Sequence, residues 1–164
     1  MSSGDLRATK ANRDNATTVV VSACLLGRPC RYDGGSKSHA GVTARVQALR
    51  DHGVVVVPVC PEEAGGLGTP RPAAELRGGD GAAVLREKAT VARVEDGVDV
   101  TDAFVGGAHA EARRAGPVAE AILKARSPSC GVGHTHIDGE VARGDGVFAA
   151  LLRQNGVRIS TEEA

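Results

Sequence analysis

Residues 18–24 read TVVVSAC, and residues 54–60 read VVVVPVC. Each stretch is a short β-branched run that ends in a cysteine. Continuous apolar runs of this kind are typical of strands that are buried on both faces, as in a parallel sheet. Between them, residues 41–52 repeat apolar side chains at helical spacing, and Gly53 follows where a helix would end. The sequence therefore predicts a strand, a helix and a second strand, which is the unit of an α/β fold.

The rest of the chain continues the alternation of strands and helices. Residues 118–124 predict a strand or a buried helix, and residues 88–94 predict a hairpin with residues 98–100. We also expect a helix at 101–115, capped by Thr101 or Asp102, and a helix at 146–155, capped by Asp145. A short strand should follow at 157–160. We therefore expect the fold class α/β, as a single Rossmann-like domain over residues 18–164 with a mostly parallel sheet flanked by helices.

Two segments interrupt this pattern. Residues 1–17 have neither periodicity nor an apolar cluster, so we expect a disordered N-terminal tail. Residues 61–81 are rich in glycine and proline, and we expect a long irregular loop that lies over the ends of the strands. Loops of that length in a compact domain are usually functional.

The charge balance limits the classes of partner. Twenty basic and twenty acidic residues give a formal net charge of zero, which argues against a nucleic acid polymer or an anionic membrane as partner. No uncharged run approaches the roughly 20 apolar residues that cross a bilayer, and the N-terminal stretch has no apolar signal region. We expect a cytoplasmic protein that acts on a small molecule.

Three of the four cysteines follow strand-like runs. Cys24, Cys60 and Cys130 would meet at one edge if those runs are neighbouring parallel strands, since ligands bind at the carboxyl ends of such strands. In a reducing cytosol such cysteines bind metal or act in catalysis more often than they form disulfides. Three thiolates without a fourth predict a metal centre with an open position, with iron favoured over zinc. The alternative is that each thiol is a small buried hydrophobe.

Polar residues accompany two of these cysteines. Glu62 lies two residues after Cys60, and Pro61 restricts the backbone between them, so the carboxyl group can act as a general acid or base near the metal. A solvated loop acid is the alternative. Ser127 and Ser129 precede Cys130, and either hydroxyl could face the same pocket or simply belong to a turn.

Other polar residues carry weaker signals. Arg31, Arg71 and Arg126 lie in the cysteine-bearing or overlying loops and could hold a planar polar ligand, or could be solvated at the surface. His134 and His136 would share one side of a strand and could bind zinc, although no third ligand accompanies them. The chain has neither a dinucleotide-binding nor a triphosphate-binding fingerprint, which argues against a nicotinamide or ATP enzyme.

Five motifs in order carry a resemblance to a known family: SACLLG with CRYDGGSK, VPVCPEE followed by GGLGTPRPAAEL, DVTDAF, AILKARSPSCG, and GDGVFAALLRQNGV. Over residues 19–160 the chain resembles the bacterial domain-of-unknown-function family to which thiouracil desulfurase belongs. The resemblance implies a [4Fe-4S] cluster that Cys24, Cys60 and Cys130 hold, with one iron not ligated by the protein. It leaves Cys30 as a loop thiol outside the ligand set.

The resemblance also implies an activity. On this resemblance, Glu62 and Ser127 would form the catalytic pair. The reaction would be a non-redox hydrolysis that removes sulfur from a thiolated nucleobase such as 2-thiouracil and releases sulfide. Residues 131–146 differ from the family pattern in carrying two histidines, so the motifs are more specific for the family than for the substrate. One alternative is a non-catalytic iron-sulfur or zinc-binding protein in sulfur or metal handling. Another is a structural α/β module with buried free thiols.

Overall fold

The computed structural model describes residues 17–164, so the predicted tail at residues 1–17 lies outside the described residues except for Thr17. The main feature is a sheet of four strands in the order β2-β1-β5-β8. These strands are β1 (Thr18–Ser22), β2 (Val55–Val59), β5 (Glu120–Leu123) and β8 (Arg158–Thr161). All three pairings are parallel, which confirms the prediction of an α/β fold with a mostly parallel sheet.

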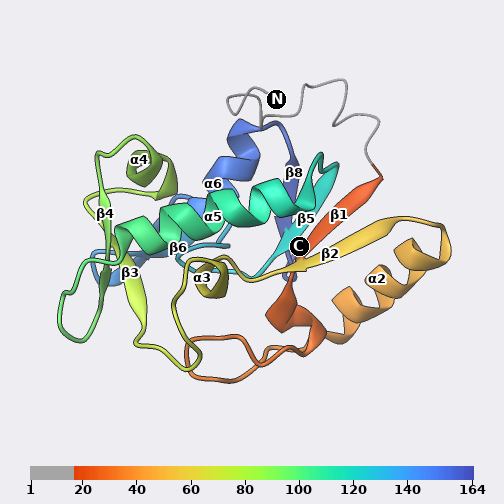
Figure 1. Cartoon of the computed structure of the whole chain (residues 1–164), viewed down its shortest axis with the longest axis horizontal. Coiled ribbons are helices and arrows are strands. Elements are labelled where there is room, and N and C mark those ends of the chain that lie inside the picture. Colours follow the sequence, from red (N-terminus) through yellow and green to blue (C-terminus); the bar gives the residue numbers. More distant parts are fainter. Residues whose placement is uncertain (1–16) are drawn as a thin grey trace.

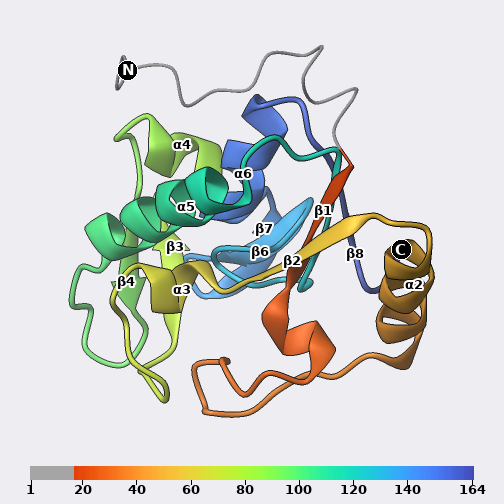
Figure 2. The same ribbon diagram turned by 45° about the vertical axis from the view of Figure 1, so that its right-hand side comes forward.

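Helices cover both faces of this sheet (Figure 1). The three helices are α2 (Ala40–Asp51), α5 (Thr101–Ala115) and α6 (Val147–Gln154). Turning the molecule by 45° separates α2 at one side of the sheet from α5 and α6 at the other (Figure 2). The helix predicted at residues 41–52 is therefore present, and it begins where the His39 side chain accepts a hydrogen bond from the backbone N–H of Val42 at 3.2 Å.

The central strand β1 is buried because its side chains alternate between the two layers. Val19 and Val21 pack in a hydrophobic cluster with Val42 and Val46 of α2. Val20 points the other way, into a larger cluster to which α5 and α6 contribute. The uninterrupted valine run thus reflects burial on both faces, as the sequence predicted.

A second, mixed sheet in the order β4-β3-β6-β7 was not predicted. Its strands are β3 (Ala74–Arg77), β4 (Thr90–Arg93), β6 (His134–Ile137) and β7 (Glu140–Arg143), and the short helix α4 (Gly81–Leu85) precedes β4. The prediction of an irregular loop over residues 61–81 was therefore wrong in part. The predicted hairpin at 88–94 with 98–100 is present in a short form, since Ala92 bridges Asp99 and the backbone N–H groups of Arg93 and Val100 donate to the carbonyl oxygens of Val98 and Val91, while β4 also pairs with β3.

Two predicted helix caps are wrong. Helix α5 has Val100 at its N-cap position, and Asp99 takes over the capping role, since its carboxylate accepts the backbone N–H of Thr101 at 2.8 Å. Helix α6 has Gly146 at its N-cap position. The Asp145 side chain instead accepts the backbone N–H of Gly133 at 2.8 Å and so links α6 to the start of β6.

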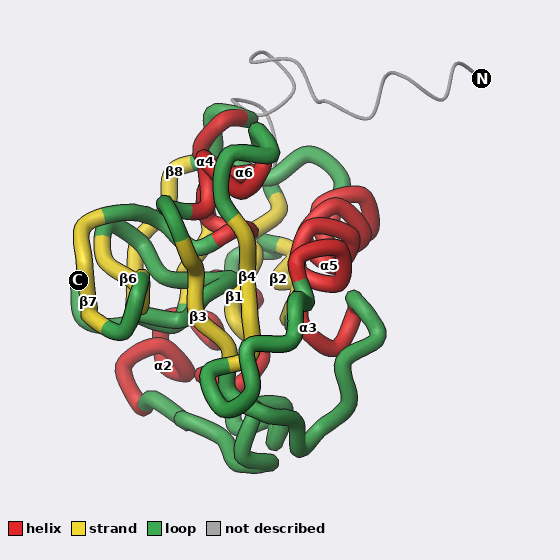
Figure 3. The backbone as a smooth tube through the Cα atoms, turned by 90° about the vertical axis from the view of Figure 1, so that its left-hand side faces the viewer, coloured by secondary structure: helices red, strands yellow, loops and turns green. Residues whose placement is uncertain are grey.

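The short helix α3 (Pro61–Ala64) packs directly on α5, as the tube view of Figure 3 shows. The contact needs two glycines. A Cβ atom at Gly65 would lie 2.1 Å from the carbonyl oxygen of Ala103, and one at Gly107 would lie 1.9 Å from the carbonyl oxygen of Pro61. The missing side chains therefore set how closely α3 approaches α5. None of the helices described in residues 17–164 is long and apolar enough to cross a membrane.

Candidate functional site

Three loops meet at the carboxyl ends of β2, β1 and β5. The chain passes from β1 to β2 on one side and later returns to β5 on the other, so this edge is the switch point where open α/β sheets bind ligands. A cavity of about 560 Å³ opens there. All four cysteines line it: Cys24 on the short helix η1 (Ala23–Leu26), Cys30 on the following loop, Cys60 directly after β2, and Cys130 on the loop after β5. The predicted convergence of three cysteines is thus present, with a fourth beside them.

Burial governs the protonation of two of these thiols. Cys24 is 8% and Cys130 4% exposed. Burial, more than any other cause, raises the pKa of the Cys24 thiol to about 11 and that of Cys130 to about 12, and the negative charges of neighbouring thiolates contribute to both values. That mutual effect places Cys24, Cys60 and Cys130 within electrostatic reach of one another.

The remaining two thiols form a close pair. The Cys60 Sγ lies 3.6 Å from the carbonyl oxygen of Cys30. Hydrogen bonding from the Cys30 thiol lowers the pKa of Cys60 to about 7, and the same contact raises the pKa of Cys30. Cys60 is therefore the thiol most readily ionised, in line with the rule that the thiolate is the reactive and metal-binding form.

The spacing of the sulfur atoms bears on what they can hold. Thiolates on a single zinc ion lie about 2.3 Å from it, and so within about 4.6 Å of each other. Among the described residues, the sulfur atoms of Cys24, Cys60 and Cys130 do not all lie within 4.8 Å of one another. The three thiols therefore do not form a ready site for one ion, whereas a cluster is bound through a different iron by each cysteine and does not need them that close.

Glu62 faces this pocket from helix α3. Its side chain is 14% exposed, and its Oε1 accepts a hydrogen bond from Arg71 Nε at 3.3 Å. Its Oε2 accepts one from the Ser129 hydroxyl at 3.1 Å. A carboxylate offers about four lone-pair sites, so two fixed contacts orient Glu62 and leave acceptor capacity on both oxygens.

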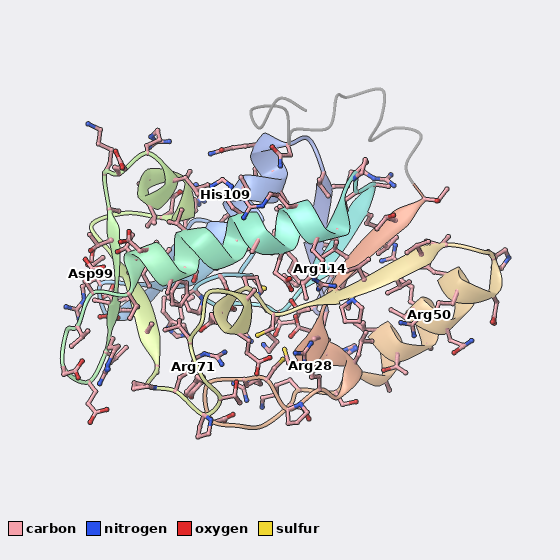
Figure 4. The ribbon with its side chains drawn as sticks, in the orientation of Figure 1. Arg28, Arg50, Arg71, Asp99, His109 and Arg114 are labelled. Carbon is pink, nitrogen blue, oxygen red and sulfur yellow. The ribbon has the colours of Figure 1, made fainter. Side chains whose placement is uncertain are left out.

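Arg71 connects the loops around the pocket. Its guanidinium group is 7% exposed and donates to Glu62, to the carbonyl oxygens of Cys30 and Gly68, and to the Thr69 hydroxyl. Figure 4 shows Arg71 and Arg28 in the region where the yellow sulfur atoms gather. Because a guanidinium has five donors in a rigid fork, one side chain fixes two loops relative to each other.

Ser127 organises the loop that carries Cys130. Its hydroxyl oxygen accepts the backbone N–H groups of Ser129 at 3.2 Å and of Cys130 at 3.0 Å. It also lies 3.3 Å from the Ser129 hydroxyl, which in turn contacts Glu62. The structure therefore brings Glu62 and Ser127 to one wall of the pocket, with Ser129 between them.

The other polar candidates divide into two groups. Arg31, Arg71, Arg126 and His136 line the pocket. The Arg126 guanidinium, however, forms an exposed ion pair with Glu163. His134 and His136 are both exposed on β6, and no third potential ligand joins them in the part of the chain that the structure describes, so the zinc pair gains no support.

Sequence reasoning missed one buried group beside the site. Glu111 on α5 is 6% exposed, and its carboxylate accepts the backbone N–H of Cys60 at 2.9 Å while pairing with Arg114. The available signal was an acidic residue within the apolar stripe of an amphipathic helix. A buried charge of this kind is usually paired, and here it holds the backbone of a pocket cysteine.

Fold and pocket together define an α/β enzyme whose cysteine loops surround a cavity at the carboxyl edge of the parallel sheet. The chain belongs to the 2-thiouracil desulfurase family, whose model matches residues 19–164. This confirms the family predicted from the five motifs.

Two relatives match along nearly the whole chain. The uncharacterized protein YbbK of Bacillus subtilis (strain 168) is 40% identical over an alignment of 149 residues that covers 88% of this chain and 95% of that protein. A solved structure of the [4Fe-4S]-dependent thiouracil desulfidase TudS is 39% identical, with a TM-score of 0.71. That match covers 89% of this chain and 91% of the other, so the likeness extends over nearly the whole fold rather than one motif.

Proposed function

We propose that this protein is a [4Fe-4S]-dependent desulfurase that removes sulfur from a thiolated pyrimidine base such as 2-thiouracil, by hydrolysis without redox chemistry. The observation that carries the proposal is that Cys24, Cys60 and Cys130 line one pocket together with Glu62 and Ser127. Membership of the 2-thiouracil desulfurase family and the likeness to a [4Fe-4S]-dependent thiouracil desulfidase support it.

The donor set fits such a cluster. Cysteine thiolates are the usual ligands of iron-sulfur clusters, and these three thiols line one pocket without forming a site for a single ion. We propose Cys24, Cys60 and Cys130 as the ligands, which leaves one iron without a protein ligand. The chemistry that such a group supplies when bound is a soft Lewis acid with an affinity for the thiocarbonyl sulfur.

The proton movements fall to Glu62. In the overall reaction, the thiocarbonyl base and water give the carbonyl base and hydrogen sulfide. Glu62 accepts a proton from the water whose oxygen attacks the carbon, and returns a proton to the departing sulfur. Arg71 and Ser129 keep the carboxylate oriented during both transfers, because each holds one of its oxygens.

Ser127 has two roles in this proposal. It holds the turn that presents Cys130, because its oxygen accepts two backbone N–H groups. Its hydroxyl proton is free to point to Ser129, which continues the hydrogen-bond chain to Glu62. Ser127 therefore assists the reaction from the wall of the pocket that it shares with Glu62.

The test is anaerobic purification with iron and sulfide analysis, followed by an assay of sulfide and uracil formed from 2-thiouracil. We expect about four irons per chain, and equal amounts of sulfide and uracil without an added reductant. Cys24→Ser should lose both the iron and the activity. A protein that holds iron but releases no sulfide from any thiolated pyrimidine would instead be a non-catalytic metal or sulfur carrier.

A further inference from the structure

A second set of potential ligands lies at the edge of the same pocket. The Sγ atoms of Cys30 and Cys60 and a carboxylate oxygen of Glu63 all lie within 4.8 Å of one another. Ligands of one zinc ion lie within about 4.6 Å of each other, given bonds of about 2.3 Å to sulfur and about 2.0–2.2 Å to oxygen. This spacing suits a single ion. The three cysteines of the proposed cluster are not this close together.

We infer that Cys30, Cys60 and Glu63 form a zinc site that shares Cys60 with the cluster, so that zinc and the cluster exclude each other. Two thiolates and a carboxylate are three ligands of the types zinc prefers, and a water molecule would complete a tetrahedron. The mutual exclusion rests on the function proposed above, whereas the zinc site itself does not.

The backbone places these ligands without help from a metal. Cys60 and Glu63 are three residues apart around the first turn of α3, so they lie on the same side of it. Cys30 comes from a distant loop, and its carbonyl oxygen is held by the Arg71 guanidinium at 3.0 Å. A site that is already assembled loses little entropy when the ion binds.

The surroundings also suit a divalent cation with three anionic ligands. Glu63 Oε1 accepts a hydrogen bond from Arg28 at 2.9 Å, and its Oε2 accepts one from the Thr69 hydroxyl. Contacts of this kind orient a ligating carboxylate, which keeps further lone pairs for the metal. Two thiolates, one carboxylate and Zn²⁺ leave one negative charge, and Arg28 and Arg71 offset it.

Cys30 would act as a zinc ligand in this site. In the proposed cluster Cys30 is not a ligand, yet it is 3% exposed and lines the pocket. Zinc at Cys30 and Cys60 would withhold one of the three cluster ligands. The enzyme would therefore lose its cluster capacity in proportion to its zinc occupancy.

The experiment measures two metals on the full chain and its variants. One half determines zinc affinity under anaerobic conditions with Zn²⁺ alone, against a chromophoric chelator. The other half determines iron bound after cluster reconstitution, and circular dichroism checks the fold of every variant. Cys30→Ser and Glu63→Gln should weaken zinc binding about tenfold or more and leave the iron content unchanged.

Cys24→Ser and Cys130→Ser are the matched controls, since both remove a buried thiol from the same pocket. They should lose iron and keep zinc, and Cys60→Ser should lose both. Adding zinc before reconstitution should lower the iron content of the wild type but not of Cys30→Ser. Equal loss of zinc in Cys130→Ser and Cys30→Ser would overturn the inference, as would a wild type that binds no zinc. Failure of the proposed function would show separately, as a chain that binds no iron.

Discussion

At the scale of single residues, the pocket depends on how Glu62 is held. Arg71 and Ser129 each fix one carboxylate oxygen, at 3.3 Å and 3.1 Å. Both partners are themselves buried and come from different loops, so the carboxylate has little freedom to turn away. An acid or base that is fixed in this way can transfer protons in one defined geometry.

We predict that Glu62→Gln lowers kcat for sulfide release by roughly 10²–10⁴-fold, the usual contribution of a general acid-base group. The amide keeps the shape and an oxygen for Arg71 or Ser129, but it cannot exchange a proton. Iron content and the visible spectrum should stay as in the wild type. Steady-state assays on reconstituted protein measure this, with Glu140→Gln on β7, outside the pocket, as the control. Unchanged kcat in Glu62→Gln would remove Glu62 from the mechanism.

The sequence indicated these residues to different degrees. Cys24, Cys60 and Glu62 follow strands that a valine run makes evident, so their place at the pocket could be predicted. The contact of Ser129 with Glu62 spans 67 positions and depends on how two loops fold against each other. The local sequence pattern carries no information on contacts between residues so far apart. The hydrogen bond from the Cys60 backbone N–H to Glu111 could not be predicted for the same reason.

At the scale of elements, the parallel sheet was predictable and the second sheet was not. Strand β1 is a continuous apolar run because both faces of the sheet are covered there, whereas β2 keeps the apolar run at the sheet edge, where only Val59 is buried. Strands β3, β4, β6 and β7 have four residues each and carry charged or polar side chains, so their alternation is too short to recognise. Their pairing depends on tertiary contacts, such as the single parallel pair Leu76 with Ile137 that joins β3 to β6.

The contact of α3 with α5 provides a prediction at this scale. A Cβ at Gly107 would lie 1.9 Å from the carbonyl oxygen of Pro61, so Gly107→Ala must push α3 and its Glu62 away from the helix. We expect a loss of stability of about 1–3 kcal/mol from this overpacking and a fall in kcat. Gly106→Ala, where no atom lies within 4 Å, is the matched control and should be neutral or stabilising by about 0.5–1 kcal/mol. Urea unfolding and steady-state assays measure both, and equal stability of the two variants would contradict the prediction.

Asp145 provides a second prediction, because it joins α6 to β6. Burial opposes ionisation of its carboxyl group, but hydrogen bonds from Arg153 and from the backbone of Gly133 outweigh burial and lower its pKa. A pKa that is lower in the folded state gives stability that is present above the unfolded value of about 3.9 and disappears as the pH falls through the folded value. Asp145→Asn should therefore cost about 1–3 kcal/mol at pH 7 and less at pH 3, which lies below the unfolded value. Urea unfolding of both proteins at the two pH values measures this, and a constant difference would contradict it.

At the scale of the whole molecule, the two sheets share one hydrophobic core. The cluster on the α5 side contains buried side chains from both sheets and from the helices between them, among them Val20, Val59, Leu76, Val91, Phe104 and Phe148. The pocket lies where these layers meet, with cysteines after the strands of the parallel sheet and His136 on the mixed sheet. Both sheets therefore contribute side chains to a single core, together with α5 and α6.

We therefore predict that residues 18–164 unfold as one domain. Leu76 and Val91 of the mixed sheet are fully buried and belong to the same hydrophobic cluster as Val20 of β1, Phe104 of α5 and Phe148 of α6, so unfolding the mixed sheet alone would open the shared core. Far-UV circular dichroism in urea should show a single transition. Hydrogen exchange followed by mass spectrometry should give peptides from β1 and from β3–β4 the same urea midpoint. Exchange of the mixed sheet at lower urea, while β1 stays protected, would instead divide the chain into two units and place the pocket on a boundary that opens by itself.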